Sequence, residues 1–393
     1  MNQLQDFDLK NKKVFIRADL NVPIKSGKIT SSQRIESSLA TINYCLKAGA
    51  KVMVTSHLGR PKEGEYNPEF SLEPVVKFLE NHLNQKINLI KDWTTQSFDV
   101  DAGEIVVLEN CRFNVGESSN NENLAKKYAA LTDIFVMDAY GTAHRKQAST
   151  YGIAQFCPKV CAGQLFYSEL AALEKVMTNS KSPMVAIVGG SKVSTKLSIL
   201  DSLADKVDQL ILGGGIANTF LKAQGFNIGN SLHENDFIDS AKKIIQKLES
   251  RGASLPLVTD VICGKQLNEN EIAVKKNIND LEPTDMIFDL GPETMKGITQ
   301  NLKQSKTILW NGPIGVFEFD QFSKGTETLA HAIANSIGFS LAGGGDTIAA
   351  LEKFGMIKNI SYISTAGGAF LEFVEGKKLP AIEILEKRST IEH

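Results

Sequence analysis

Arginine and histidine recur just after the first apolar segments of this sequence. Only seven of its 43 basic residues are arginine, and five of those seven lie within the first 145 residues. A guanidinium group is a planar fork of donors that binds phosphate or carboxylate oxygens in pairs, whereas lysine is the simpler solubilising charge. The residues in question are Arg17, Arg34, His57, Arg60, Arg112 and Arg145. Their placement predicts a basic, anion-binding face in the first half of the chain.

A carboxylate and an amide accompany the first of these arginines in the segment RADLNVP, residues 17–23. In an extended strand Arg17, Asp19 and Asn21 would share one side, because alternate side chains point to the same face. The next such segment, SHLGRP at residues 56–61, combines histidine and arginine in a loop that glycine and proline make tight. The first segment favours a site for a small anionic ligand over a merely solvated face. In the second, a structural and a functional role for the histidine remain equally open.

The second half of the chain is rich in glycine where its apolar segments end. The segment VGGSKVSTK, residues 188–196, leads into a predicted helix that would carry Lys192 and Lys196 on one side, four residues apart. Positive charges in the first turns of a helix oppose its dipole, and a bound anion would offset that cost. Further glycine turns within residues 212–220 and 311–319 would let a flat group approach the backbone.

The segment AGGGDT, residues 342–347, places Asp346 and Thr347 at a predicted helix start after three glycines. Bare backbone at a helix N-terminus can bind an anion through its N–H groups. Asp346 could be the helix N-cap or an oxygen ligand for Mg²⁺ on nucleotide phosphates, and of these two roles we favour the metal role. The sequence contains neither the G-x-x-x-x-G-K-[ST] nor the G-x-G-x-x-G pattern. A nucleotide site therefore has to be inferred from its surroundings.

Short apolar segments alternate with helical patterns along the chain, which is typical of α/β proteins with buried parallel strands. Eleven such segments occur, four before and seven after a helical stretch at residues 164–178. In open sheets of this kind, ligands bind at the carboxyl ends of the strands. Eleven strands are many for one sheet, so we predict two domains, residues 1–170 and 171–375.

The overall composition limits the class of protein. A chain of 393 residues with 42% hydrophobic residues can bury two ordinary cores. A net charge of -2 gives no general attraction to nucleic acid or membranes, so we expect neither as a partner. The first residues do not resemble a signal peptide, and no apolar run approaches the roughly 20 residues that span a bilayer. With five cysteines and no C-x-x-C pair, we expect reduced thiols in a cytoplasmic protein.

Eight motifs, in the same order, resemble those of the phosphoglycerate kinase family across nearly the whole chain. They are RADLNVP, SHLGRP, DAYGTAHR, GGSKVSTK, GGGIANTF, WNGPIGVFE, GGGDT and STAGGAFLEFVEG. The resemblance implies a reversible glycolytic reaction, in which the acyl phosphate of 1,3-bisphosphoglycerate passes to MgADP and yields 3-phosphoglycerate and MgATP. It also implies direct in-line transfer after hinge closure, without a phosphoenzyme.

The resemblance further implies roles for individual residues. Those implied to bind the glycerate substrate are Asp19, Asn21, Arg34, His57, Leu58, Gly59, Arg60, Arg112 and Arg145. Those implied to bind ATP or ADP are Lys196, Gly213, Gly214, Gly312, Pro313, Glu318, Gly344, Gly345, Asp346 and Thr347. Asp346 would hold Mg²⁺, while Arg34, Lys192 and Lys196 would stabilise the transferring phosphoryl group.

The family fold implied by these motifs is a monomer of two doubly wound, Rossmann-like parallel-sheet domains joined by a long helix. The active-site cleft would lie between the domains, and residues 376–393 would pack back on the first. One departure from the family is Ala366, which stands where a glycine is usual. Alanine keeps the backbone N–H, so we predict that Ala366 is tolerated because this N–H is what matters. A Cβ is penalised at positive φ, so a positive φ at Ala366 would contradict the prediction.

Two other functions agree with parts of the sequence. An NAD-dependent dehydrogenase would suit the fold class, but the missing G-x-G-x-x-G pattern after a strand argues against it. A non-catalytic, two-domain anion-binding protein would explain the arginines, yet it would leave the glycine turns, lysines and carboxylate of the second half without a role.

Overall fold

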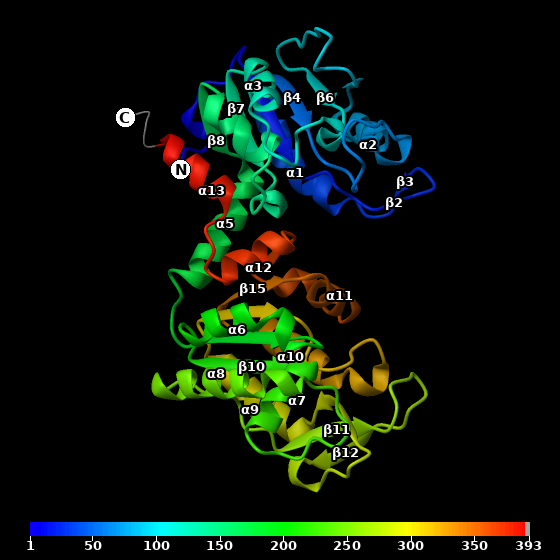
Figure 1. The fold of residues 1–393 in the computed structure, drawn as a ribbon, viewed down its shortest axis with the longest axis vertical. Helices are drawn as coiled ribbons and strands as arrows, with labels where there is room; N and C mark the ends of the chain where they lie inside the picture. Colours follow the sequence, from blue (N-terminus) through cyan, green and yellow to red (C-terminus); the bar gives the residue numbers. More distant parts are fainter. Residues whose placement is uncertain (390–393) are drawn as a thin grey trace. The chain divides into compact units, whose positions relative to one another are not determined.

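The structure is a computed structural model that describes residues 1–389. It divides into two compact units (Figure 1). The first unit comprises Met1–Ala171 and the segment that begins at Lys378, and the second comprises Ala172–Lys377. Each unit has its own parallel sheet, so the predicted α/β class is confirmed.

The first unit is built on a six-stranded parallel sheet with the order β5-β6-β4-β1-β7-β8. The strands are β1 (Lys13–Ala18), β4 (Lys51–Thr55), β5 (Asn88–Ile90), β6 (Ile105–Leu108), β7 (Ile134–Asp138) and β8 (Lys159–Ala162). A separate hairpin pairs β2 (Ile24–Lys25) with β3 (Lys28–Ile29). The four central strands are almost wholly apolar and buried, as expected where helices cover both faces of a parallel sheet.

Helices cover the two faces of this sheet in the doubly wound manner. The helices are α1 (Gln33–Lys47), α2 (Glu73–Leu83), α3 (Glu122–Ala130) and α4 (Ile153–Phe156). Apolar side chains of α1 and α2, such as Ile42 and Leu79, pack in one core cluster with Ile16 of β1. On β1 the neighbouring side chain, Phe15, points to the other face, where its ring meets Tyr128 of α3 edge-on at 5.4 Å.

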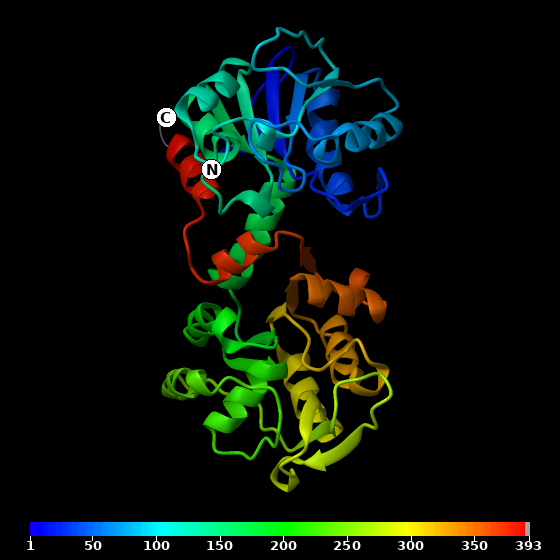
Figure 2. The ribbon, with the colours of Figure 1, turned by 45° about the vertical axis from the view of Figure 1, so that its right-hand side comes forward.

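A segment from the end of the chain belongs to the first unit. Helix α13 (Pro380–Ser389) packs against β8 and α4. It lies beside β8 in Figure 1, and Figure 2 shows it, in red, on the first unit from another side. The Ala381 N–H donates to the carbonyl of Ala143 at 3.0 Å. The Arg388 guanidinium donates to the carbonyls of Gln155 and Cys157, each at 3.0 Å.

The second unit contains a five-stranded parallel sheet with the order β10-β9-β14-β15-β16. The strands are β9 (Met184–Gly189), β10 (Gln209–Gly213), β14 (Thr307–Asn311), β15 (Phe339–Gly343) and β16 (Tyr362–Ser364). The helices are α6 (Leu197–Ala204), α7 (Gly214–Ala223), α8 (Ile238–Ser250), α9 (Pro292–Gln304), α10 (Lys324–Ala334), α11 (Gly345–Lys353) and α12 (Gly368–Val374). Four of these strands end in Gly or Asn, so glycine-rich turns gather at the carboxyl edge.

Two of the apolar segments expected as parallel strands have a different arrangement. They contribute β11 (Asp260–Gly264) and β13 (Met286–Leu290), which form an antiparallel sheet with β12 (Val274–Asn277). The expectation of parallel pairing was wrong for these two, because an apolar run indicates burial and not the direction of its partner strand.

The division between the units falls within helix α5 (Gln164–Met177). The carboxylate of Asp138, at the end of β7, accepts from the N–H groups of Leu165 and Phe166 at 3.0 and 3.1 Å. It therefore serves the free N–H groups of the first turn. Across residues 1–389, no helix is both long enough and apolar enough to span a membrane.

Candidate active site

The predicted substrate residues of the first unit follow four neighbouring strands. Asp19 and Asn21 follow β1, His57 to Arg60 follow β4, Arg112 follows β6 within the short helix η3 (Cys111–Phe113), and Arg145 lies beyond β7. Because these strands are parallel and adjacent in the sheet, their carboxyl ends open on one edge. The structure therefore brings these loops to a common face, which we call the basic face.

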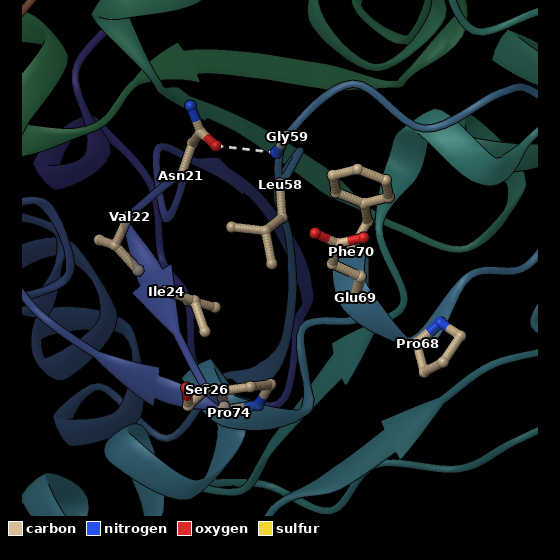
Figure 3. Close-up of a pocket in the computed structure, with 11 residues that line it drawn as sticks. Asn21, Val22, Ile24, Ser26, Leu58, Gly59, Pro68, Glu69, Phe70 and Pro74 are labelled. Atoms are coloured by element: carbon tan, nitrogen blue, oxygen red, sulfur yellow. Dashed lines mark hydrogen bonds between the residues drawn. The ribbon is translucent and has the colours of Figure 1, made fainter.

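Arg34, near the start of α1, joins the loop that follows β1. Its guanidinium lies 3.2 Å from Oδ2 of Asp19, and it also reaches the carbonyl of Asn21 at 3.4 Å. The Asn21 side chain accepts a hydrogen bond from the Gly59 N–H at 2.9 Å (Figure 3). These contacts connect the loops after β1 and β4. However, β1 ends at Ala18, so the expectation that Arg17, Asp19 and Asn21 share one face of a strand was wrong.

His57 lies within reach of the positive charges of four arginines. Its side chain is buried, with 6% exposed. Burial lowers the pKa of the imidazole well below its usual range, and the charges of Arg17, Arg112, Arg145 and Arg34 lower it further. His57 is therefore neutral at pH 7, and it can offer a ligand a hydrogen bond rather than a charge.

The remaining arginines of the basic face differ in exposure. Arg112 is 9% exposed and donates to the Gly59 carbonyl, and burial lowers the pKa of its guanidinium. Arg145 is half-buried, and Arg60 is exposed. Within residues 1–389, no carboxylate forms an ion pair with Arg60, Arg112 or Arg145. The basic face thus holds positive charge that the protein itself leaves largely uncompensated.

A pocket of about 400 Å³ lies next to this face and is lined on one side by Asn21, Leu58 and Gly59 (Figure 3). Apolar side chains, including Ile24 and Phe70, form much of the remaining wall. None of the arginines lines it. This pocket therefore lacks the positive charge that a strongly anionic ligand would need.

In the second unit, glycine lets neighbouring turns approach closely. A Cβ on Gly189 would lie 1.7 Å from the Pro313 carbonyl oxygen, and one on Gly213 would lie 2.3 Å from Cα of Ile314. Gly312 has a positive φ of 103°, which favours glycine. The turns after β9, β10 and β14 therefore pack backbone to backbone, and they leave peptide groups at the carboxyl edge of the sheet.

Lys196 is held in the middle of these turns. Its ammonium group donates to the Gly189 carbonyl at 2.6 Å and to Asn311 through Oδ1 at 2.7 Å and the carbonyl at 3.3 Å. Burial lowers the pKa of Lys196 to about 8, against the opposing effect of the Asp346 carboxylate. In most molecules Lys196 is therefore charged at pH 7, although its ammonium group is poorly solvated.

The expected helix that carries Lys192 and Lys196 on one side is not observed. Both residues flank a short 3₁₀ helix, η6 (Val193–Thr195), and α6 begins only at Leu197. Lys192 has extended backbone and is exposed, whereas Lys196 is half-buried. The two lysines therefore do not form an i, i+4 pair in an α-helix, and the argument from the helix dipole does not apply to them.

The GGGDT turn begins α11 after β15. Gly344 has a φ of 99°, and Gly345 and Asp346 are exposed in the first turn. The Thr347 side chain is buried, where its hydroxyl accepts from the Gly312 N–H at 2.7 Å and donates to the Gly343 carbonyl at 2.9 Å. This hydroxyl links two of the glycine turns, so a ligand at Thr347 would meet its backbone rather than its side chain.

The residues around Asp346 fit a magnesium ion that arrives with a nucleotide. Within residues 1–389, no group of three or more metal-binding side chains is found. Asp346 is a single exposed carboxylate, and its charge partly opposes the lowering of the Lys196 pKa by burial. One carboxylate is enough for Mg²⁺ when phosphate oxygens and water complete the coordination.

Two further positions bear on the nucleotide prediction. Glu318 is exposed and Pro313 half-buried in the loop after β14. Ala366 is buried, and the positive φ in its turn belongs to the next residue, Gly367, with a φ of 54°. Ala366 is not among the positive-φ residues of the described chain, so the predicted condition for tolerating alanine is met.

Sequence reasoning missed several residues that shape these sites. Asn311 binds Lys196, and Asn110 supports the loop after β4 by donating to the carbonyls of Leu58 and Phe70, both at 2.8 Å. An apolar hollow beside the second unit's glycine turns is lined partly by Leu255, Pro256 and Leu290. Lone amides and apolar loop residues give no pattern in a sequence, so only the fold reveals them.

Comparisons with known proteins agree with the motifs. The family model described as phosphoglycerate kinase matches residues 4–377. A curated phosphoglycerate kinase of Francisella philomiragia subsp. philomiragia is 57% identical over 388 residues, which cover 99% of each chain. The solved phosphoglycerate kinase of Coxiella burnetii matches with a TM-score of 0.96 and 53% identity, over 98% of this chain and 99% of that one.

A more distant solved structure extends the agreement. The phosphoglycerate kinase of Pyrococcus horikoshii OT3 is 32% identical, and it matches with a TM-score of 0.82 over 99% of this chain and 100% of that one. The match of one family model to nearly the whole sequence, together with relatives this similar, establishes that the chain belongs to the phosphoglycerate kinase family.

Proposed function

We propose that this protein carries out the reversible transfer of a phosphoryl group between 1,3-bisphosphoglycerate and MgADP, giving 3-phosphoglycerate and MgATP. As a member of its family, the protein is a glycolytic kinase with a carboxyl group as phosphoryl acceptor. The dehydrogenase and the non-catalytic binding protein are not favoured. The proposal includes cytoplasmic location, action as a monomer, and no nucleic acid or membrane as partner.

The observation that carries the proposal is the uncompensated charge of the basic face. Four arginine charges act on His57, yet of Arg34, Arg112 and Arg145 only Arg34 has a carboxylate partner. A ligand with both a phosphate and a carboxylate would supply the missing negative charge. We propose that Arg34, Arg60, Arg112 and Arg145 hold these anionic groups, and that His57, Asp19 and Asn21 orient the glycerate through hydrogen bonds.

The second unit is proposed to bind the nucleotide. The glycine turns would admit the phosphates and the sugar, with Gly213, Gly214, Gly312 and Pro313 around the base and ribose and Glu318 near the ribose hydroxyls. The apolar hollow lined by Leu255, Pro256 and Leu290 supports a place for a flat base next to these turns. Asp346 would hold Mg²⁺, which would neutralise charge on the phosphate oxygens when bound.

Phosphoryl transfer needs positioning and charge stabilisation more than covalent help from the protein. We propose that Arg34 approaches the transferring phosphoryl group from the side of the glycerate, and that Lys192 and Lys196 stabilise it from the side of the nucleotide. In one direction the carboxylate oxygen of 3-phosphoglycerate would attack the γ-phosphorus of ATP, and the β-phosphate oxygen of ADP would leave in line. In the other direction the β-phosphate oxygen would attack and the acyl oxygen would leave. Direct transfer after a closing movement, with water excluded, is part of this proposal.

The test is a coupled assay with 3-phosphoglycerate and MgATP, together with the variant Arg34→Ala. We expect turnover by the unchanged protein, and a fall in kcat of about 100-fold or more for Arg34→Ala with MgATP affinity within about twofold. Lys86→Ala, which removes an exposed charge elsewhere in the first unit, should leave both quantities unchanged. Absence of turnover by the correctly folded, unchanged protein would rule out the kinase activity. An equal loss of nucleotide affinity in Arg34→Ala would instead contradict the division of roles between the two units.

A further inference from the structure

A chain of buried polar side chains lies behind the basic face. Arg17, Ser149 and Glu117 are each 0% exposed, and His57 is 6% exposed. The Arg17 guanidinium donates from Nε to Ser149 Oγ at 2.9 Å and from Nη1 to the Ala18 carbonyl at 2.6 Å, while its Nη2 lies 3.4 Å from His57 Nδ1. Ser149 donates in turn to Glu117 Oε1. The chain thus runs from Glu117 through Ser149 and Arg17 to the imidazole.

Each member of this chain comes from a different element. Arg17 is on the central strand β1, His57 follows β4, and Glu117 lies in the loop that follows η3. Ser149 belongs to a single π-helical turn, η5 (Ala148–Gly152), a type of turn that is rare and frequent at functional sites. The Ser149 N–H also donates to Glu117 Oε1, at 3.2 Å. Glu117 therefore fixes the turn as well as the serine hydroxyl.

The chemistry of the guanidinium decides where the protons lie. An arginine side chain has five N–H donors and no acceptor. Ser149 must therefore accept from Arg17 with its lone pair, which leaves its own hydrogen for Glu117. By the same reasoning His57 Nδ1 must accept from Arg17 Nη2, so it carries no hydrogen. In the neutral ring the single N–H is then on Nε2.

A protonated imidazole would place an N–H group against the N–H groups of Arg17. The largest other charges that act on the ring come from Arg34 of α1, Arg112 of η3 and Arg145 of the segment beyond β7, and all three are positive. Nothing among the named neighbours of the ring would stabilise an imidazolium. Arg17 has no place on the surface for a ligand, since its side chain is fully buried.

We propose that Arg17, held from behind by Ser149 and Glu117, is a positioning residue that fixes His57 as the neutral tautomer with its hydrogen on Nε2. His57 then offers the anionic substrate one directed hydrogen bond, while the arginines supply the charge. This inference rests on the proposed function for the identity of the ligand. The tautomer itself is a property of the free protein.

The test is nitrogen NMR of protein with ¹⁵N-labelled histidine, without substrate. The chain has six histidines, and the spectrum of His57→Gln identifies the signals of His57. We expect the Nε2–H tautomer, with a pKa well below the usual range of a histidine. The variant Arg17→Met keeps an apolar stem but removes the donor, so His57 should exchange between its two neutral tautomers. Arg60→Met, which removes a nearby exposed charge, should leave the tautomer unchanged.

A binding measurement extends the test to the ligand. For the unchanged protein, affinity for 3-phosphoglycerate should vary with pH only as far as the ligand itself titrates. In Arg17→Met the affinity should be lower at each pH, because part of the population then carries its hydrogen on Nδ1 and cannot donate from Nε2. Arg17→Lys, which keeps a donor-only group, should restore part of the unchanged behaviour.

The outcomes separate this inference from the proposed kinase activity. A free protein in which His57 carries its hydrogen on Nδ1, or titrates near pH 6.5, would overturn the inference whether or not the protein is a kinase. So would Arg17→Met with an unchanged His57 spectrum. If Arg17→Met does not fold, Ser149→Ala replaces it, since the loss of the acceptor at Nε should free Arg17 and broaden or shift the His57 signals. A chain with the expected tautomer but no turnover would refute the kinase proposal alone.

Discussion

The rate of phosphoryl transfer is expected to fall above about pH 8 because Lys196 loses its charge there. Its ammonium group lies among three oxygen acceptors from Gly189 and Asn311, at 2.6 to 3.3 Å. Burial lowers the pKa of this group from 10.5 to about 8, although the Asp346 carboxylate acts in the opposite direction. The charged form would stabilise the phosphate oxygens of a nucleotide much more strongly than the neutral amine.

The size of the effect follows from the position of this pKa. With a pKa of about 8, roughly nine tenths of Lys196 is charged at pH 7 and roughly one tenth at pH 9. The value of kcat/KM for MgATP, which reports the free enzyme, should therefore fall about tenfold for each pH unit above about 8. A bound phosphate favours the charged lysine, so the corresponding fall in kcat should occur at higher pH.

The assay is the initial rate with 3-phosphoglycerate saturating and MgATP varied, from pH 6 to about 9.5. The informative variant is Lys196→Arg, because a guanidinium with a pKa above about 12 stays charged throughout this range. Its kcat should be lower than that of the unchanged protein, since the fork does not fit the space of an ammonium group. The fall in kcat/KM near pH 8 should nevertheless be absent.

Other buried groups can be separated from Lys196 in this experiment. Burial raises the pKa of Asp289 to about 8 and that of the Cys111 thiol to about 11, so Asp289 alone of these two titrates in the same range. Asp289→Asn is therefore the matched control, and the alkaline fall should remain in it. The reasoning about Lys196 is refuted if the fall persists in Lys196→Arg, or if the unchanged protein shows no fall up to pH 9.5.

Two further predictions concern stability and are measured by urea denaturation. Gly189→Ala should lower the free energy of unfolding by about 3 kcal/mol, since its Cβ would lie 1.7 Å from the Pro313 oxygen. Gly297→Ala, which has open space within helix α9, should raise it by about 0.5 to 1 kcal/mol, and similar effects of the two changes would contradict this. Burial raises the pKa of Asp138 from 3.8 to about 7. Between about pH 4 and 7 the folded protein therefore keeps a proton on Asp138 that the unfolded chain has released, so the free energy of unfolding should fall as pH rises. Asp138→Asn should flatten this slope and leave the interval from pH 7 to 8 unchanged, whereas an equal slope in both proteins would exclude Asp138 as its source.

The α/β class and the carboxyl-edge turns could be predicted because they depend on local patterns. Apolar runs such as the first four residues of β7, Ile134 to Met137, mark buried strands whatever their partners. The edge strands β5 and β8 were missed because they have three and four residues and include polar ones. The direction of strand pairing could not be predicted either, because it depends on which strands the chain brings together. The antiparallel strands β11 and β13 are the example.

The site predictions depended on the same distinction between local pattern and tertiary contact. Arg34 and Asp19 were expected near each other because both follow β1, and the structure places them 3.2 Å apart. Lys192 and Lys196 were placed on an α-helix because their spacing suits one, but the buried Val193 lies in a 3₁₀ turn that separates them. Arg17 was grouped with the surface arginines, since nothing in its sequence context indicates that a serine 132 residues later accepts its hydrogen bond.

The two arginines outside the first 145 residues also bind several oxygen atoms each. Arg251 donates to the carbonyls of Ala204 and Val207, and Arg388 donates to carbonyls of the segment that precedes β8. Each therefore gathers several oxygen acceptors at once, which a planar fork does better than an ammonium group. Lysine supplies most of the ion pairs on the surface, such as Lys126 with Glu122. An arginine in this sequence thus indicates a place where several oxygens converge, whether they belong to the backbone or, on the basic face, to the proposed ligand.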